Sequence, residues 1–161
     1  MYQRILVPID GSPTSSRGLD EALALARLMG ASLRLVHVVD QWTFTAGCET
    51  YTPDIMEILL ADGRKILDAA TARAAAGEVI ATGLLSETFG GRVSDIVVDE
   101  ARRWKADLIV VGTHGRRGVR RMVIGSDAEQ IVRAAPVPVL LVNAAGNDID
   151  AAPVRAAEVA Q

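Results

Sequence analysis

The chain has 161 residues, a length typical of one domain. Half of the residues are hydrophobic but only 4% are aromatic, which favours the aliphatic core of a helix-covered parallel sheet over that of a β-sandwich. The formal net charge of −3 argues against a general nucleic-acid binder, which is usually basic. The single cysteine suits a reducing compartment. Neither a signal peptide nor a membrane span is visible, and we therefore expect a cytoplasmic protein.

The first 40 residues predict a strand, a helix and a second strand. Residues 4–10, RILVPID, are a short apolar run that ends at a turn, as in a buried strand. In the next segment Ser12 can cap a helix, Pro13 suits its first turn and Gly30 suits its end. Residues 31–40, ASLRLVHVVD, form a second apolar run, which we interpret as the second strand.

The remaining chain continues the alternation. Residues 41–53 lack a helical period and predict a long loop. A helix is then expected from Pro53 to about Ala75, with an apolar face formed by Ile55, Ile58, Leu59, Ile66 and Leu67. The same patterns predict strands at 78–86, 106–112 and 136–142, and helices at 93–105 and 126–134. We expect one domain over 1–143, followed by a tail or short helix over 144–161.

Five strands alternating with four helices predict an α/β fold. Right-handed crossovers make it an open, doubly wound parallel sheet of order 3-2-1-4-5, with helices on both faces. In this order the chain reverses direction between strands 1 and 4. Ligands of such sheets bind at this point, outside the carboxyl ends of the strands. The segment after strand 4 is therefore the first place to look for a ligand site.

That segment, GTHGRRGVRRMVIGSDAEQ over 112–130, combines glycines, arginines and the start of a helix. Such a combination is suited to an anion. It is not a P-loop, because no lysine occurs in 106–161. The segment after strand 1, DGSPTSS, lacks the dinucleotide fingerprint, and no G-x-S-x-G motif occurs. Only two histidines accompany the single cysteine, so the sequence gives little support for a nucleophilic triad or a zinc site.

The glycine spacing resembles that of a known family. Gly112, two residues, Gly115, nine residues, Gly125 and Ser126 match the G-2x-G-9x-G-S/T pattern of the ATP-binding branch of the universal stress proteins. The ILVPIDGS and PVPVLLV segments are similar to that family too, and the resemblance covers about residues 2–143. It implies a Rossmann-like fold that binds adenine nucleotide, forms dimers and has a role in stress survival.

The resemblance also implies roles for individual residues. Pro8 would shape the end of strand 1, Asp10 would hydrogen-bond the ribose and Val38 would pack against adenine. Gly112 and Gly115 would let the backbone approach the ribose and α-phosphate. The outer phosphates would meet Gly125 and Ser126, with Asp127 beside them as a competitor for the same amides or as a ligand of Mg²⁺.

Simpler structural roles compete with these assignments. Asp10 also suits a turn before Gly11. Ser126 to Glu129 have the pattern of a capping box, with serine at the N-cap and glutamate at N3. Val38 and His37 suit the core or an edge of the sheet, and His114 suits solvent. The loop arginines suit a solvated loop, although at least one phosphate contact, with Arg116 first in line, would use their charge.

Three functions remain open at this stage. The first is a regulatory protein that binds ATP, with Mg²⁺ as a candidate counter-ion and little or slow hydrolysis. The second is an enzyme, a slow ATPase or nucleotidyl transferase, in which Asp10 and Asp127 hold Mg²⁺. The third is a structural dimer with a vestigial site. Residues 136–142 are an apolar edge strand in the predicted order, and we expect a second copy to pair with it in a homodimer. The competing cover for this edge is the tail, residues 143–161, folded back over it. No membrane or nucleic-acid partner is expected.

Overall fold

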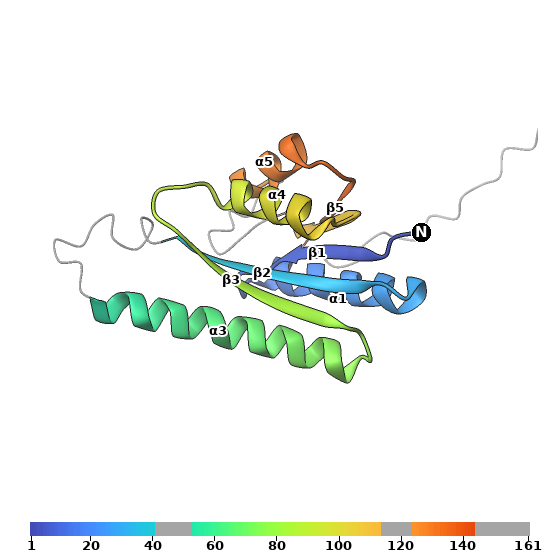
Figure 1. The fold of residues 1–161 in the computed structure, drawn as a ribbon, viewed down its shortest axis with the longest axis horizontal. Helices are drawn as coiled ribbons and strands as arrows, with labels where there is room; N and C mark the ends of the chain where they lie inside the picture. Colours follow the sequence, from blue (N-terminus) through green and yellow to red (C-terminus); the bar gives the residue numbers. More distant parts are fainter. Residues whose placement is uncertain (41–52, 114–123, 144–161) are drawn as a thin grey trace, which may run out of the picture.

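The computed structural model describes residues 1–40, 53–113 and 124–143, and these form a five-stranded parallel sheet (Figure 1). The order β3-β2-β1-β4-β5 confirms the predicted doubly wound topology. The predictions for the loop at 41–52, for Gly115 and Arg116, and for the tail at 144–161 lie outside the described residues. The strands are β1 (Arg4–Pro8), β2 (Ser32–Asp40), β3 (Ala81–Thr88), β4 (Leu108–Gly112) and β5 (Val139–Val142).

Helices cover both faces of the sheet, as expected. Helices α1 (Pro13–Met29) and α3 (Pro53–Ala76) lie on one face, while α4 (Val93–Trp104) and α5 (Ser126–Ala134) lie on the other (Figure 1). Within the described ranges, no helix is both long and apolar enough to cross a membrane. The sheet is therefore the middle of three layers, and its carboxyl edge is the place where the loops to the helices begin.

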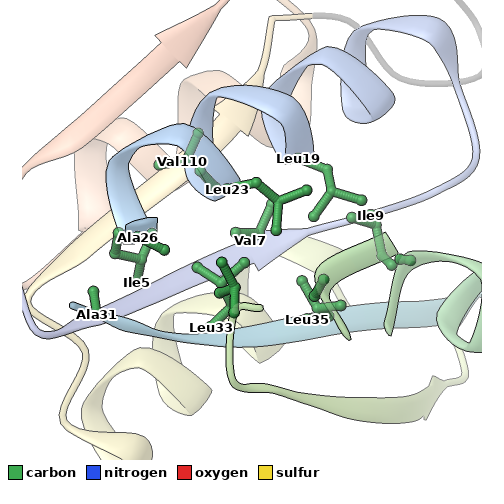
Figure 2. Close-up of a cluster of buried hydrophobic side chains, with 14 of the residues drawn as sticks. Ile5, Val7, Ile9, Leu19, Leu23, Ala26, Ala31, Leu33, Leu35 and Val110 are labelled. Carbon is green, nitrogen blue, oxygen red and sulfur yellow. The ribbon is translucent and has the colours of Figure 1, made fainter. Parts of the chain in front are cut away.

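The sheet is apolar on both faces because successive side chains of a strand point to opposite sides. In β1, Ile5 and Val7 pack towards α1, whereas Leu6 belongs to the cluster under α4 and α5. Figure 2 shows the first of these clusters, in which Leu19 and Leu23 of α1 meet the strands. Burial on both faces explains why these strands have continuous apolar runs.

Local signals predicted the limits of α1 correctly. Ser12 is the N-cap, and its hydroxyl accepts a hydrogen bond from the Ser15 amide at 3.2 Å. Pro13 occupies the first turn, and Gly30 ends the helix in the left-handed conformation, with φ of 66°. Each of these residues acts within its own turn of chain, which is why the sequence alone was enough to locate them.

The predicted strand limits needed several corrections. Strand β5 begins at Val139 and not at 136, where Pro136 and Pro138 lack the amide hydrogen that a strand donates. Strand β1 ends at Pro8 and not at Asp10, because the Asp10 amide turns away to bond the Ser15 hydroxyl. Strand β3 begins at Ala81 and not at 78, since Glu78 still belongs to the turn after α3 and has φ of 58°. In α3, the apolar face expected from the sequence includes a residue that the structure leaves exposed. Ile58 is 60% exposed, and smaller alanines further along the helix, Ala70 and Ala74, fill the core instead.

Candidate functional site

The turn after β1 places Asp10 at the carboxyl edge of the sheet. The Asp10 carboxylate accepts a hydrogen bond from the Ser12 amide at 2.9 Å, and the Asp10 amide donates to the Ser15 hydroxyl at 3.1 Å. Asp10 therefore stabilises the turn that joins β1 to α1, which is the simpler role predicted from the sequence. This contact uses oxygen Oδ1 and holds the carboxyl group against the first turn of α1.

The end of β4 packs against the same turn of α1. A Cβ atom built on Gly112 would lie 2.8 Å from the carbonyl carbon of Thr14 and 3.0 Å from the Ser15 nitrogen. Carbon atoms normally approach to about 3.5–4.0 Å, so only glycine fits this position without movement. Gly112 thus has a packing role in addition to any role towards a ligand. Ser15 touches both Asp10 and the end of β4, and it joins the two halves of the site.

The glycine loop returns to its starting point. The Gly125 amide donates to the Thr113 carbonyl at 2.7 Å, and the Thr113 amide donates to the Val142 carbonyl at 2.8 Å. These bonds tie the start of α5 to the ends of β4 and β5. Residues 112–113 and 125–127 are consequently neighbours, as the spacing of the glycine pattern requires. Gly115 and Arg116 lie between them, outside the described residues.

The first turn of α5 differs from the predicted capping box. The N-cap is Gly125, with no side-chain cap, and Ser126 is already the first helical residue. The Glu129 carboxylate does not turn back to the helix start, because it pairs with Arg133 at 2.8 Å. Ser126 and Asp127 are exposed, and the first amides of α5 have no partner within the helix. Such a helix start can accept an anion.

A cavity of about 390 Å³ lies between the carboxyl end of β2 and helix α3. Val38 lines it, and the same residue also packs against the cluster under α4 and α5. Ile66 forms part of its wall and lies 3.2 Å from a Cβ built on Gly11, beside Asp10. Apolar walls next to a carboxylate would suit the base and ribose of a nucleoside. The cavity is lined by His37, Val38, Val39, Leu59, Asp62, Lys65 and Ile66.

Sequence reasoning did not find the α3 side of this cavity. Asp62 and Lys65 form an exposed ion pair at 3.1 Å, and nothing in their spacing relates them to β2. A signal was nevertheless present. Gly63 lies in the middle of a long helix, where glycine costs stability and implies that something packs closely. Its neighbour is His37, which is buried as predicted.

Sequence reasoning also did not identify a buried carboxylate on α4. Glu100 of α4 is 2% exposed and pairs with Arg34 of β2 at 2.7 Å and with Arg103. Arg34 lies near the amino end of β2. This network therefore lies towards the amino ends of the strands, whereas the candidate site lies at their carboxyl ends. Its arrangement is a packing feature of the α4 face.

The described part of the candidate site holds single carboxylates. No group of three or more histidine, cysteine, aspartate or glutamate side chains that could hold a metal occurs within the described ranges. Magnesium is usually held by one or two carboxylates together with substrate phosphates. The residues at this edge fit that mode, with Asp127 as the exposed carboxylate beside the start of α5.

Comparison with known proteins agrees with the glycine pattern. The model of the universal stress protein family matches residues 1–143. The universal stress protein MJ0531 of Methanocaldococcus jannaschii is 32% identical over 143 residues, which cover 88% of this chain and 82% of that protein. A protein of the universal stress family from Burkholderia pseudomallei, whose crystal structure is known, is 37% identical in sequence to this chain. The two structures match with a TM-score of 0.71 over 87% of this chain and 95% of that one.

Two similar structures contain adenine nucleotides. A universal stress protein in complex with cAMP is 28% identical, with a TM-score of 0.61, over 89% of this chain and 98% of that chain. The universal stress protein of Archaeoglobus fulgidus in complex with dAMP is 27% identical, with a TM-score of 0.63, over 88% and 98% of the two chains. Homologues of this chain therefore bind adenine nucleotides.

Proposed function

The chain belongs to the universal stress protein family, and we propose that it binds an adenine nucleotide, ATP foremost, in a regulatory role in the stress response. The cAMP and dAMP complexes of its homologues support this proposal. The observation that carries it for this chain is the junction at Ser15. There the Asp10 turn and the end of β4 meet at one point of the carboxyl edge.

The ligand would cross this junction from the β2 side to the start of α5. Its base would lie at the end of β2, where Val38 lines the cavity next to α3. Its ribose would meet Asp10, whose position Pro8 and the Ser12 amide help to define. The polar end of the nucleotide would then lie at the glycine loop.

The phosphates would lie against the first turn of α5. The Gly125 amide is held by the Thr113 carbonyl, so Gly125 would contribute close approach of its backbone, while the amides from Ser126 onward lack a side-chain cap. An anion is stabilised at such a helix start. Asp127 would stay near the phosphates only with help from a cation, which is the reason to test Mg²⁺. Gly115 and Arg116, from the loop between β4 and α5, would complete the phosphate contacts.

We also propose a homodimer through β5. This strand is at the edge of the sheet, and Leu140 in its centre is 38% exposed. An uncovered apolar edge strand tends to pair with another strand. Pairing with the same strand of a second copy about a two-fold axis would cover both edges at once.

The nucleotide proposal is tested by two measurements on the full chain. Native mass spectrometry of the purified protein should find a bound adenine nucleotide, and calorimetry should give tighter binding of ATP than of GTP. Asp10→Asn should weaken ATP binding about tenfold, because the ribose would bond to a neutral amide oxygen in place of a charged carboxylate, which forms stronger hydrogen bonds. Its matched control is Asp99→Asn on α4, which removes an exposed carboxylate paired with Arg102 and should leave binding unchanged.

The enzyme alternative predicts a different result. In a single-turnover experiment with labelled ATP, an ATPase or nucleotidyl transferase would convert bound ATP within the time of one turnover. A regulatory binder would release it unchanged. Absence of binding to ATP, ADP, AMP and cAMP in the folded protein would refute the proposed function and favour a structural dimer.

A further inference from the structure

His37 is buried at the end of β2, in contact with the turn that carries Asp10. Its side chain is 4% exposed, and ring nitrogen Nδ1 lies 2.7 Å from the carbonyl oxygen of Ile9. A carbonyl oxygen only accepts hydrogen bonds, so Nδ1 carries the hydrogen and donates it. Through a side chain, the bond joins the end of β2 to the turn that follows β1, next to the residue proposed to meet the ribose.

The hydrogen bond from His37 fixes one end of a single peptide group. The Ile9 carbonyl and the Asp10 amide belong to the same planar unit. The carbonyl accepts from His37, and the amide donates to the Ser15 hydroxyl at 3.1 Å. Both polar ends of this plane are therefore held, and the direction in which Asp10 leaves the backbone is fixed with them.

Helix α3 holds the imidazole from the other side. A Cβ atom built on Gly63 would lie 2.8 Å from Cδ2 and 3.2 Å from Nε2 of His37, so the helix backbone packs directly on the ring. Leu85 of β3 lies equally close to the same point, at 2.8 Å. The ring is confined between a strand and a helix, and its edge also lines the cavity proposed for the base.

We infer that His37 is a positioning residue for nucleotide binding, which orients Asp10 by holding the Ile9–Asp10 peptide and lets α3 and the base cavity act on that orientation. This inference rests on the proposed function, because its readout is the affinity for an adenine nucleotide. His37 itself needs no contact with the ribose or phosphates. Its effect passes through Asp10.

Three substitutions at position 37 separate the hydrogen bond from packing. His37→Leu keeps the approximate size but removes the donor. His37→Asn restores an amide N–H at about the place of Nδ1, whereas His37→Gln places it one atom further out. We expect His37→Leu and His37→Gln to weaken AMP binding about tenfold, the effect of one lost buried hydrogen bond, and His37→Asn to recover most of the affinity.

A double-substitution cycle tests the route through Asp10. In the Asp10→Asn background, His37→Leu should weaken AMP binding less than twofold, because the group that His37 orients has already lost its charge. Calorimetry gives the affinities, and circular dichroism with thermal unfolding shows that each variant is folded. The control is Leu35→Val, a buried change on the same face of β2 that lowers stability but leaves the hydrogen bond from His37 to the Ile9 carbonyl in place. It should bind AMP as the wild type does.

Gly63→Ala disturbs the position of the His37 ring without replacing the histidine. The added methyl group must push the ring, and affinity for AMP should fall as it does for His37→Leu. Gly83→Ala is its control, since the new Cβ would lie 3.3 Å from the flexible end of Leu67. If His37→Leu does not fold, the comparison of the His37→Asn, His37→Gln and Gly63→Ala variants decides whether AMP binding depends on the hydrogen bond from His37.

The possible results are distinct. If the wild type binds no adenine nucleotide, the proposed function fails and this inference fails with it. If the wild type binds AMP and the folded His37→Leu and Gly63→Ala variants bind equally well, only the inference about His37 is overturned. Equal losses for His37→Leu with and without Asp10→Asn would also overturn it, because the effect would not pass through Asp10.

Discussion

Substitution of Gly112 by alanine should damage the fold and the site together. The new Cβ would lie 2.8 Å from the carbonyl carbon of Thr14 and 2.9 Å from its oxygen, which is about 0.7 Å inside the shortest normal carbon–carbon contact. Both obstructing atoms belong to the backbone of α1, so no side chain can rotate away. Overpacking of this kind costs about 1–3 kcal/mol, which corresponds to a decrease of roughly 2–12 °C in the melting temperature.

Gly18→Ala is the matched control for this experiment. Gly18 lies on α1 and faces the same strand, but its Cβ would be 3.6 Å from the Gly112 nitrogen, an ordinary contact. Alanine is favoured over glycine in a helix by about 1 kcal/mol, so this variant should be at least as stable as the wild type. Urea unfolding followed by circular dichroism measures both. A Gly112→Ala variant as stable as Gly18→Ala would refute the close packing of β4 on α1.

Three further predictions concern the loop and the edge strand. Gly115→Val should abolish ATP binding in calorimetry without unfolding the protein, because a side chain would occupy space needed by the ligand; unchanged affinity would remove the glycine loop from the site. Replacing the loop arginines by glutamine should weaken ATP binding several-fold more than adenosine binding, since only phosphates feel their charge, and equal losses would indicate a structural role for Arg116, Arg117, Arg120 and Arg121. Leu140→Lys should convert a dimer into a monomer in sedimentation at micromolar concentration, whereas a wild type that is already monomeric would exclude pairing through β5. Leu140 is preferable to Leu141 for this test, because Leu141 packs against the cluster under α4 and α5.

The sequence was sufficient for the fold because its signals are local or repeated. Apolar runs mark strands that are buried on both faces, and Ser12 with Gly30 mark the limits of α1 within single turns. Strand order then follows from the handedness of the crossovers. None of these arguments needs to know which distant residue touches which.

The details of the site depend on distant contacts, and there the sequence was insufficient. The predicted helix over 126–134 is confirmed, but the pattern from Ser126 to Glu129 also suited a capping box, and this did not form: Arg133, one turn later, pairs with the glutamate, and the N-cap is Gly125. The bond from His37 to Ile9 joins positions 28 residues apart. One partner of Glu100, Arg34, comes from β2, 66 residues earlier in the chain. A residue type and its spacing indicate that such groups need partners, but only the packed structure determines which ones they take.

The contact between Gly112 and α1 also changes how the glycine pattern should be interpreted. A glycine after β4 would be required here even without a ligand, because the backbone of Thr14 occupies the space of its side chain. The same contact brings Ser15, and through it Asp10, to the end of β4. One close approach thus serves packing and site assembly at once. Loss of nucleotide binding in a Gly112 variant therefore cannot identify a ligand contact by itself, whereas loss in a folded Gly115 variant of unchanged stability would.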